Sequence, residues 1–115
     1  MFDPLFRAFE HWNSLPSHPT LTRQFRTVYV NMLLALPGCV DGTKNGIHRD
    51  IKTHGLIVNR WMKGTQLAWI RTTSNHWLGI VEVPTTSGNG WSEITMRLWL
   101  PPATFQATKP PDVHL

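Results

Sequence analysis

The sequence predicts an α+β fold, in which two or three N-terminal helices precede a three-stranded antiparallel β-meander. Two changes along the chain carry this prediction. Up to about residue 64, apolar residues recur every three or four positions, which is the period of an amphipathic helix. Beyond Gly64 the apolar positions alternate, which is the period of a strand, and clusters of turn residues separate three such runs.

A first short helix is expected to begin at Asp3, whose side chain suits an N-cap and is followed by a proline at the first helical position. Leu5, Phe9 and Trp12 then lie four and three residues apart and form one apolar stripe. Two prolines within residues 14–19 end this helix.

A second helix is expected from Thr20 to about Leu36, because Pro37-Gly38 follows as a stop signal. The apolar face of this helix would consist of Leu21, Phe25, Val28, Met32 and Leu36. The β-branched and aromatic residues 28–30 would also suit a strand. We favour the helix on the spacing of the apolar face.

The third segment, residues 45–64, contains the most charge. As a helix it would begin at the N-cap Asn45 and place its basic residues on one face, opposite its apolar side chains. That basic face comprises Arg49, Lys52, Arg60 and Lys63. Against the helix stand Gly55, which costs about 1 kcal/mol in a helix interior, and the apolar residues 56–58, which suit a strand. We favour the helix because a strand would scatter these charges over both faces.

Three strands are expected after Gly64, over residues 65–72, 77–83 and 91–100. A short polar connection at residues 73–75 makes the first two a hairpin, and a flexible turn at residues 84–90 leads to the third. Two consecutive prolines end the last strand. We therefore expect one domain over residues 1–102 and a proline-rich tail over residues 103–115.

The composition indicates a globular protein with an anionic partner. Of the 115 residues, 41% are hydrophobic and only 16% are charged, which favours a globular protein over a disordered chain. The formal net charge is +4 and the isoelectric point is about 9.9. A basic balance of this kind favours nucleic acid as the partner.

The sequence also predicts a compartment. Cys39 is the only cysteine, so no intramolecular disulfide forms, as expected in a reducing environment. The first residues lack the apolar region of a signal peptide, and the longest apolar run, residues 32–36, is too short to span a bilayer. We expect a cytoplasmic protein that makes no membrane contact.

The expected order of three helices and a hairpin resembles a winged helix. In that fold the third helix enters the major groove and the hairpin contacts the DNA backbone nearby. The resemblance therefore implies non-catalytic nucleic-acid binding, without distinguishing DNA from RNA. The long loop 37–44 and the third strand depart from the winged-helix pattern. The implied contact residues are Arg49, Lys52, Arg60, Lys63 and Arg71.

A second candidate surface lies on the expected sheet. Alternation along the last strand places Trp91, Arg97 and Trp99 on one face, and Trp69 and Arg71 alternate together on the first strand. Aromatic rings beside arginines stack single-stranded bases in many proteins. Exposed tryptophans are also often covered by a partner. The same face therefore suits a homodimer or a protein-interaction module as the alternative function.

Metal sites and catalysis find less support. His48, Asp50 and His54 are of metal-ligating types, but His48 and Asp50 would diverge on a helix, so we expect no metal and no cofactor. A small metal-independent ribonuclease is the second alternative, because basic residues and histidines around a phosphate would suffice for it. The side chains available for such a site are His54, His76, Arg60, Arg71 and Arg97. Their spacing identifies none of them as catalytic.

Overall fold

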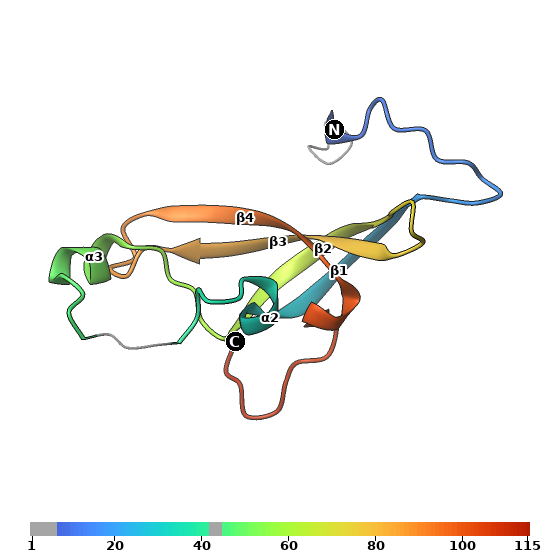
Figure 1. Cartoon of the computed structure of the whole chain (residues 1–115). Helices are drawn as coiled ribbons and strands as arrows, with labels where there is room; N and C mark the ends of the chain where they lie inside the picture. Colours follow the sequence, from blue (N-terminus) through green and yellow to red (C-terminus); the bar gives the residue numbers. More distant parts are fainter. Residues whose placement is uncertain (1–6, 42–44) are drawn as a thin grey trace.

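In the computed structural model, the chain forms one antiparallel five-stranded sheet (Figure 1). The structure describes residues 7–41 and 45–115. The strands are β1 (Leu21–Asn31), β2 (Trp61–Arg71), β3 (Trp77–Thr86), β4 (Glu93–Leu100) and β5 (Phe105–Gln106). They are arranged in the order β4-β3-β2-β1-β5. The predicted α+β fold, with N-terminal helices before a three-stranded meander, is therefore wrong, because the described chain is mostly β.

Helix contributes little to the described chain. The helices that lie wholly within it are α2 (Met32–Ala35), α3 (Arg49–His54) and the 3-10 helix η1 (Pro102–Thr104). Asp3 and Leu5 of the predicted first helix lie outside the described residues. The backbone is helical at residues 7–8 and turns at residues 9–11. Within the described ranges, no helix has both the length and the apolar character needed to cross a membrane.

The predicted helix from Thr20 to Leu36 is wrong. Most of this segment is strand β1, which pairs with β2 along its length, and only α2 near its end is helical. Val28 and Val30 are both fully buried. Residues two apart share a face in a strand but not in a helix, so the burial follows the strand period. Pairing with the distant strand β2 thus overrides the helical spacing of the sequence.

The predicted helix over residues 45–64 is also wrong, because only its middle, α3, is helical. His48, rather than Asn45, caps this helix: its Nδ1 accepts a hydrogen bond from the Asp50 backbone nitrogen at 3.0 Å. Gly55 ends the helix, and the chain then runs without helix to the start of β2. The two features that opposed the prediction, Gly55 and the apolar residues 56–58, mark this change.

Strands β2, β3 and β4 occupy the three regions predicted as strands, with shifted bounds. β2 begins before Gly64, and β3 continues past Pro84 to Thr86. The β2–β3 connection is the predicted tight hairpin, in which the Thr72 nitrogen donates to the His76 oxygen at 2.8 Å. Asn75 adopts a left-handed backbone conformation there, with φ of 65°.

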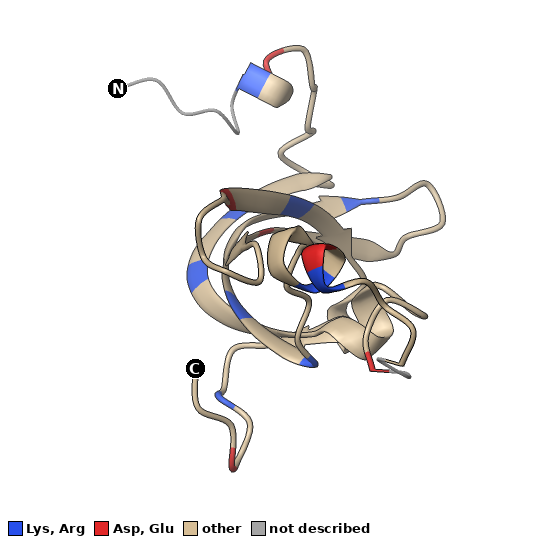
Figure 2. Cartoon of the chain, turned by 90° about the vertical axis from the view of Figure 1, so that its left-hand side faces the viewer, with Lys and Arg blue, Asp and Glu red and all other residues tan. Residues whose placement is uncertain are grey.

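The sheet curls around the main core, so that the strands form an incomplete ring when viewed from the α3 end (Figure 2). We call the inner side the concave face and the outer side the convex face. The concave core consists of Val28, Val30, Met32, Val40, Met62, Val81, Val83, Leu100 and Phe105. Phe105 belongs to β5, which η1 carries across to pair with β1. The start of the predicted tail is therefore part of the packed structure.

A smaller apolar cluster lies on the convex face. It consists of Leu67, Ala68, Ile70 and Ile80, with Phe9 of the N-terminal segment packed against it. Trp12 continues this packing, since its ring lies edge-on to Phe9 and its Nε1 donates to Thr20 Oγ1 at 3.1 Å. Phe9 and Trp12 thus pack on the convex face, and the described residues leave the concave face open near the β2–β3 hairpin.

Candidate functional site

A hollow of about 290 Å³ lies on the concave face near the β2–β3 hairpin. Described residues from four elements line it: Thr22 of β1, Trp69 of β2, Trp77 of β3 and Pro102 of η1. Thr22 and Trp69 are direct cross-strand partners, and so are Trp77 and Arg71. Partners directly opposite in an antiparallel sheet point to the same face. The strand register therefore gathers these side chains on one side of the sheet.

A bulge in β2 turns Trp69 toward this hollow. The register between β2 and β3 shifts between Gln66 and Ala68, so Leu67 is an extra residue. Gln66 and Trp69 are three positions apart and would point to opposite faces of a regular strand. The bulge brings both to the concave face, which is a common way for a sheet to redirect a side chain.

The side chain of Gln66, next to the bulge, is held by two hydrogen bonds. Its side chain is fully buried, its Oε1 accepts from Arg26 Nε at 2.8 Å, and its Nε2 donates to the Ala68 carbonyl at 3.2 Å. A buried amide with both ends bonded has little freedom to move. The amide therefore fixes the Arg26 side chain next to Trp69.

Phe105 also packs against Trp69. The two rings are 5.6 Å apart between centroids, with an interplanar angle of 33°. Phe105 lies so close to Gly79 that a Cβ added there would be 2.7 Å from Phe105 Cε1. Because Gly79 has no side chain, the phenyl ring of Phe105 can lie directly against β3. The phenyl ring in turn limits the movement of the Trp69 indole.

Each tryptophan of the hollow lies against an arginine. The Arg71 guanidinium carbon is 4.5 Å from the ring centroid of Trp77, and that of Arg26 is 6.0 Å from the ring centroid of Trp69. Both distances are within the range of a cation–π interaction. Arg71 Nε is buried and has no hydrogen-bond partner among the described residues. The site thus combines flat apolar walls with two cations, one of which has an unused donor.

The predicted basic face is not a single surface. Arg49 and Lys52 lie on α3, at the far end of the sheet from the hollow, and Arg60 lies in the connection that follows (Figure 1). Lys63 alternates with the buried Met62 and so points to the convex face. In Figure 2 the basic segments are spread around the ring of strands. Of the five predicted contact residues, only Arg71 belongs to the aromatic hollow.

The predicted tryptophan-rich face is divided between the two sides of the sheet. Trp69 and Arg71 point to the concave face. Arg97 is on the convex face, where its Nη2 is 3.7 Å from Glu82 Oε2. Trp99 is on that face too, and its ring lies 5.8 Å from that of Phe9.

Trp91, the third tryptophan of the predicted surface, precedes β4. It is 84% exposed, and its ring is 6.5 Å from the ring of His54 at the end of α3. Trp91 therefore lies at the opposite end of β3 from the hollow and does not contribute to it.

The histidines do not converge on a catalytic cleft. His54 lies beside the β3–β4 turn, whereas His76 lies in the β2–β3 turn. The ten residues of β3 separate these turns, a distance of about 30 Å in an extended strand. Within residues 7–41 and 45–115, no group of three or more His, Cys, Asp or Glu side chains is placed to hold a metal ion. The set of residues considered for a ribonuclease is therefore scattered.

Sequence reasoning missed Trp77, Thr22, Pro102 and Arg26. A signal for Trp77 was present, because pairing the two predicted strands across residues 73–75 sets Trp77 opposite Arg71. The others had no usable signal, since Thr22 and Arg26 lie in a segment with helical spacing and Pro102 stood at the predicted end of the domain. No protein-family model, curated protein or solved structure matches this chain. Its function is therefore argued from the hollow.

Proposed function

We propose that this protein binds single-stranded nucleic acid without catalysing a reaction on it, and that an unpaired base enters the hollow between Trp69 and Trp77. The observation that carries the proposal is the pairing of each of these tryptophans with an arginine. An indole stacks on the flat face of any base, which contributes about 1–3 kcal/mol per base. The neighbouring guanidinium groups suit the phosphates on either side of that base.

The guanidinium group of Arg71 favours an anionic ligand. Its carbon is 4.5 Å from the ring centroid of Trp77, so a ligand stacked on that ring lies beside a fixed positive charge. A phosphate or a base carbonyl supplies an oxygen that this charge attracts. The net charge of +4 favours a polyanion over a neutral aromatic molecule.

The shape of the site favours a single strand over a duplex. The hollow lies on the concave face and has a volume of about 290 Å³, which suits one ring system. Bases in a duplex are stacked inward, and proteins read them with an element that projects into a groove. The described chain offers no long helix for that purpose, and α3 has only six residues.

Fluorescence anisotropy with labelled oligo(dT) and oligo(rU) tests the proposal. Trp77→Ala should weaken binding about tenfold or more, since it removes one stacking wall. Trp91→Ala removes an equally large ring from the opposite end of the molecule and should leave the affinity unchanged. Raising the salt concentration should weaken binding of the wild-type protein, because the phosphate contacts displace counterions.

Three results would contradict the proposal: no binding of either oligonucleotide, equal losses for Trp77→Ala and Trp91→Ala, or binding of an aromatic mononucleotide with no affinity for the oligomers. The last would indicate a pocket for a small anion instead. The labelled RNA should also stay intact during the titration. Its cleavage would indicate a ribonuclease and would refute non-catalytic binding.

A further inference from the structure

Strand β4 leaves one of its edges open. It lies at the end of the strand order, and among the described residues it pairs only with β3. Its register with β3 has no shift over eight residues, and its sequence contains neither proline nor lysine. Natural edge strands are usually protected from pairing with other chains by such features. β4 carries two charged side chains, Glu93 and Arg97, but neither a bulge nor a proline, so a further strand can pair along this edge.

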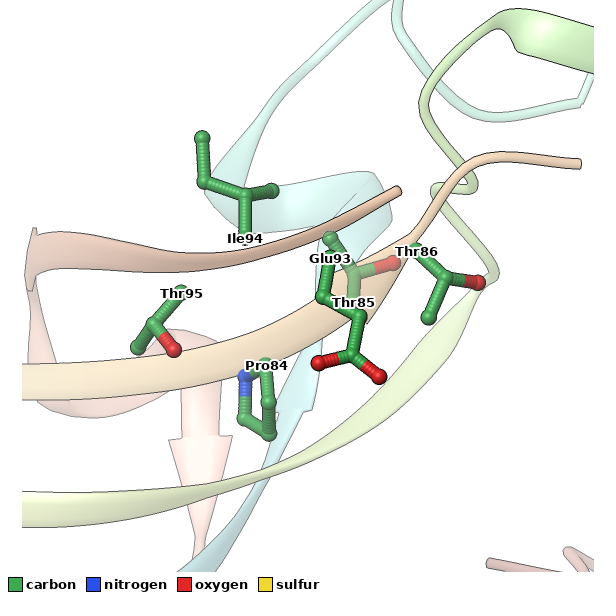
Figure 3. Close-up of a pocket in the computed structure, with 6 residues that line it drawn as sticks. All are labelled: Pro84, Thr85, Thr86, Glu93, Ile94 and Thr95. Carbon is green, nitrogen blue, oxygen red and sulfur yellow. The ribbon is translucent and has the colours of Figure 1, made fainter. Parts of the chain in front are cut away.

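The side chains of β4 alternate between the two faces of the sheet. Figure 3 shows Ile94 on one side of the β3–β4 pair, and Glu93 and Thr95 on the other. Arg97 continues the row of Glu93 and Thr95 along the convex face, because it is two positions further on. These side chains are exposed, with Ile94 at 57%.

The acidic Glu93 and the basic Arg97 lie two residues before and two residues after Thr95 in β4. In an antiparallel pair of strands, the residue numbers of each two directly opposite residues add up to the same value. If two copies of β4 pair around a two-fold axis at Thr95, Glu93 of each copy lies opposite Arg97 of the other. Thr95 then lies opposite itself, and Ile94 lies opposite Met96. Cross-strand pairs of opposite charge and apolar cross-strand pairs both stabilise a sheet.

The neighbouring registers lack this complementarity. An axis at Ile94 sets Glu93 opposite Thr95, and an axis at Met96 sets Thr95 opposite Arg97. In both cases the acidic and basic side chains lose their partners. The axis at Thr95 also aligns Trp91 with Trp99 of the second copy. The pattern W-x-E-I-T-M-R-x-W over residues 91–99 thus selects one register.

We propose that β4 pairs antiparallel with β4 of a second copy of this chain, centred on Thr95, and joins the two sheets into one. The concave faces then lie on the same side of the joined sheet, because a two-fold axis perpendicular to a sheet preserves its faces. The hollow lined by Trp69 and Trp77 is outside this contact. The proposal is therefore independent of nucleic-acid binding.

Sedimentation equilibrium tests the dimer. The wild-type protein should show a concentration-dependent monomer–dimer equilibrium. Thr95→Lys places two like charges opposite each other on the axis and should weaken association about tenfold or more. Thr73→Lys adds the same charge at the exposed β2–β3 hairpin and should associate as the wild type does. A wild-type protein that stays monomeric, or equal losses for the two variants, would overturn the proposal.

Cysteine cross-linking tests the register, with Cys39→Ser as the background. Opposite residues in an antiparallel pair have Cα atoms about 4.5–5.5 Å apart, within the range that a disulfide spans. Thr95→Cys alone should therefore form a disulfide-linked dimer on mild oxidation. Glu93→Cys alone should not, because its two copies would be about 14 Å apart along the strands. A mixture of Glu93→Cys and Arg97→Cys chains should cross-link. A dimer in which Glu93→Cys alone cross-links as readily as Thr95→Cys would refute this register.

Discussion

At Gly79, the lack of a side chain lets Phe105 lie directly on β3. The phenyl ring in turn packs against Trp69, so one missing methyl group determines the position of a wall of the hollow. Gln66 has a comparable role, because its buried amide holds Arg26 beside Trp69 through a partly buried hydrogen bond. At the scale of single residues, the site depends on positions that do not line it.

We expect Gly79→Ala to destabilise the protein by about 1–3 kcal/mol, because the added Cβ overlaps the ring of Phe105 and forces it to move. Urea denaturation would measure the loss. Phe105→Leu has a shorter side chain and should reduce the penalty of Gly79→Ala when the two are combined. A cycle in which the two losses simply add would show that this contact does not constrain the fold.

Gln66→Leu should cost about 1–3 kcal/mol, because it leaves Arg26 Nε next to an apolar side chain without an acceptor. Gln106→Leu is the matched control at an exposed position and should change stability by less than about 0.5 kcal/mol. Thermal unfolding of the two variants would compare them. Similar losses at both sites would contradict the role given to the buried amide.

At the scale of elements, the secondary structure was decided by strand pairing wherever the local spacing of apolar residues was ambiguous. The run after Gly64 alternates so clearly that β3 and β4 follow from the sequence, and so does most of β2. β1 does not follow, because its apolar residues also fit a helical stripe and only its pairing with β2 selects the strand. The two bulges, one in β1 and one in β2, have no local signature either, and the second directs Trp69 into the hollow.

Helix α3 is attached to the sheet through the β3–β4 turn. The Gly88 nitrogen donates to the Gly55 oxygen at 3.0 Å, and the Asn89 nitrogen donates to the Thr53 oxygen at 2.9 Å. A Cβ at Gly88 would overlap the carbonyl group of Lys52. None of the residues of α3 is buried, so the core does not depend on this attachment.

Gly88→Ala should therefore detach α3 while the sheet remains folded. We expect faster trypsin cleavage after Arg49 and Lys52, because proteases cut segments that open locally. Gly90→Asn is a suitable control, since space is open around Gly90 and asparagine tolerates its positive φ of 76°. If Gly88→Ala is cleaved at the wild-type rate, α3 is held by other contacts.

At the scale of the whole molecule, the positive charge is distributed rather than concentrated. The sequence carries a net charge of +4, and its alternation named Trp69 and Arg71 as candidates for stacking. It did not show that Arg97 and Trp99 point to the other face, because that depends on how β4 pairs with β3. It also did not show that Trp77 and Pro102 meet Trp69, because a curled sheet and the η1 crossover bring them together.

This distribution predicts unequal effects of removing charge. Arg71→Gln should weaken oligonucleotide binding more than Arg49→Gln combined with Lys52→Gln, although the double variant loses twice the charge. Arg71 lies against Trp77, whereas the other two lie on α3 at the far end of the sheet. Anisotropy titrations at one salt concentration would compare the variants. A larger loss in the double variant would place the binding surface on α3.

The six tryptophans provide the most direct test of the central claim, that a base stacks in the hollow. Each indole N–H gives one resonance in a nitrogen–proton NMR spectrum, and assignment by single Trp→Phe variants identifies them. On titration with oligo(dT), we predict large shifts for Trp69 and Trp77, and none for Trp12 and Trp91. Shifts confined to Trp91 and Trp99, or no shifts at a saturating concentration, would contradict the account.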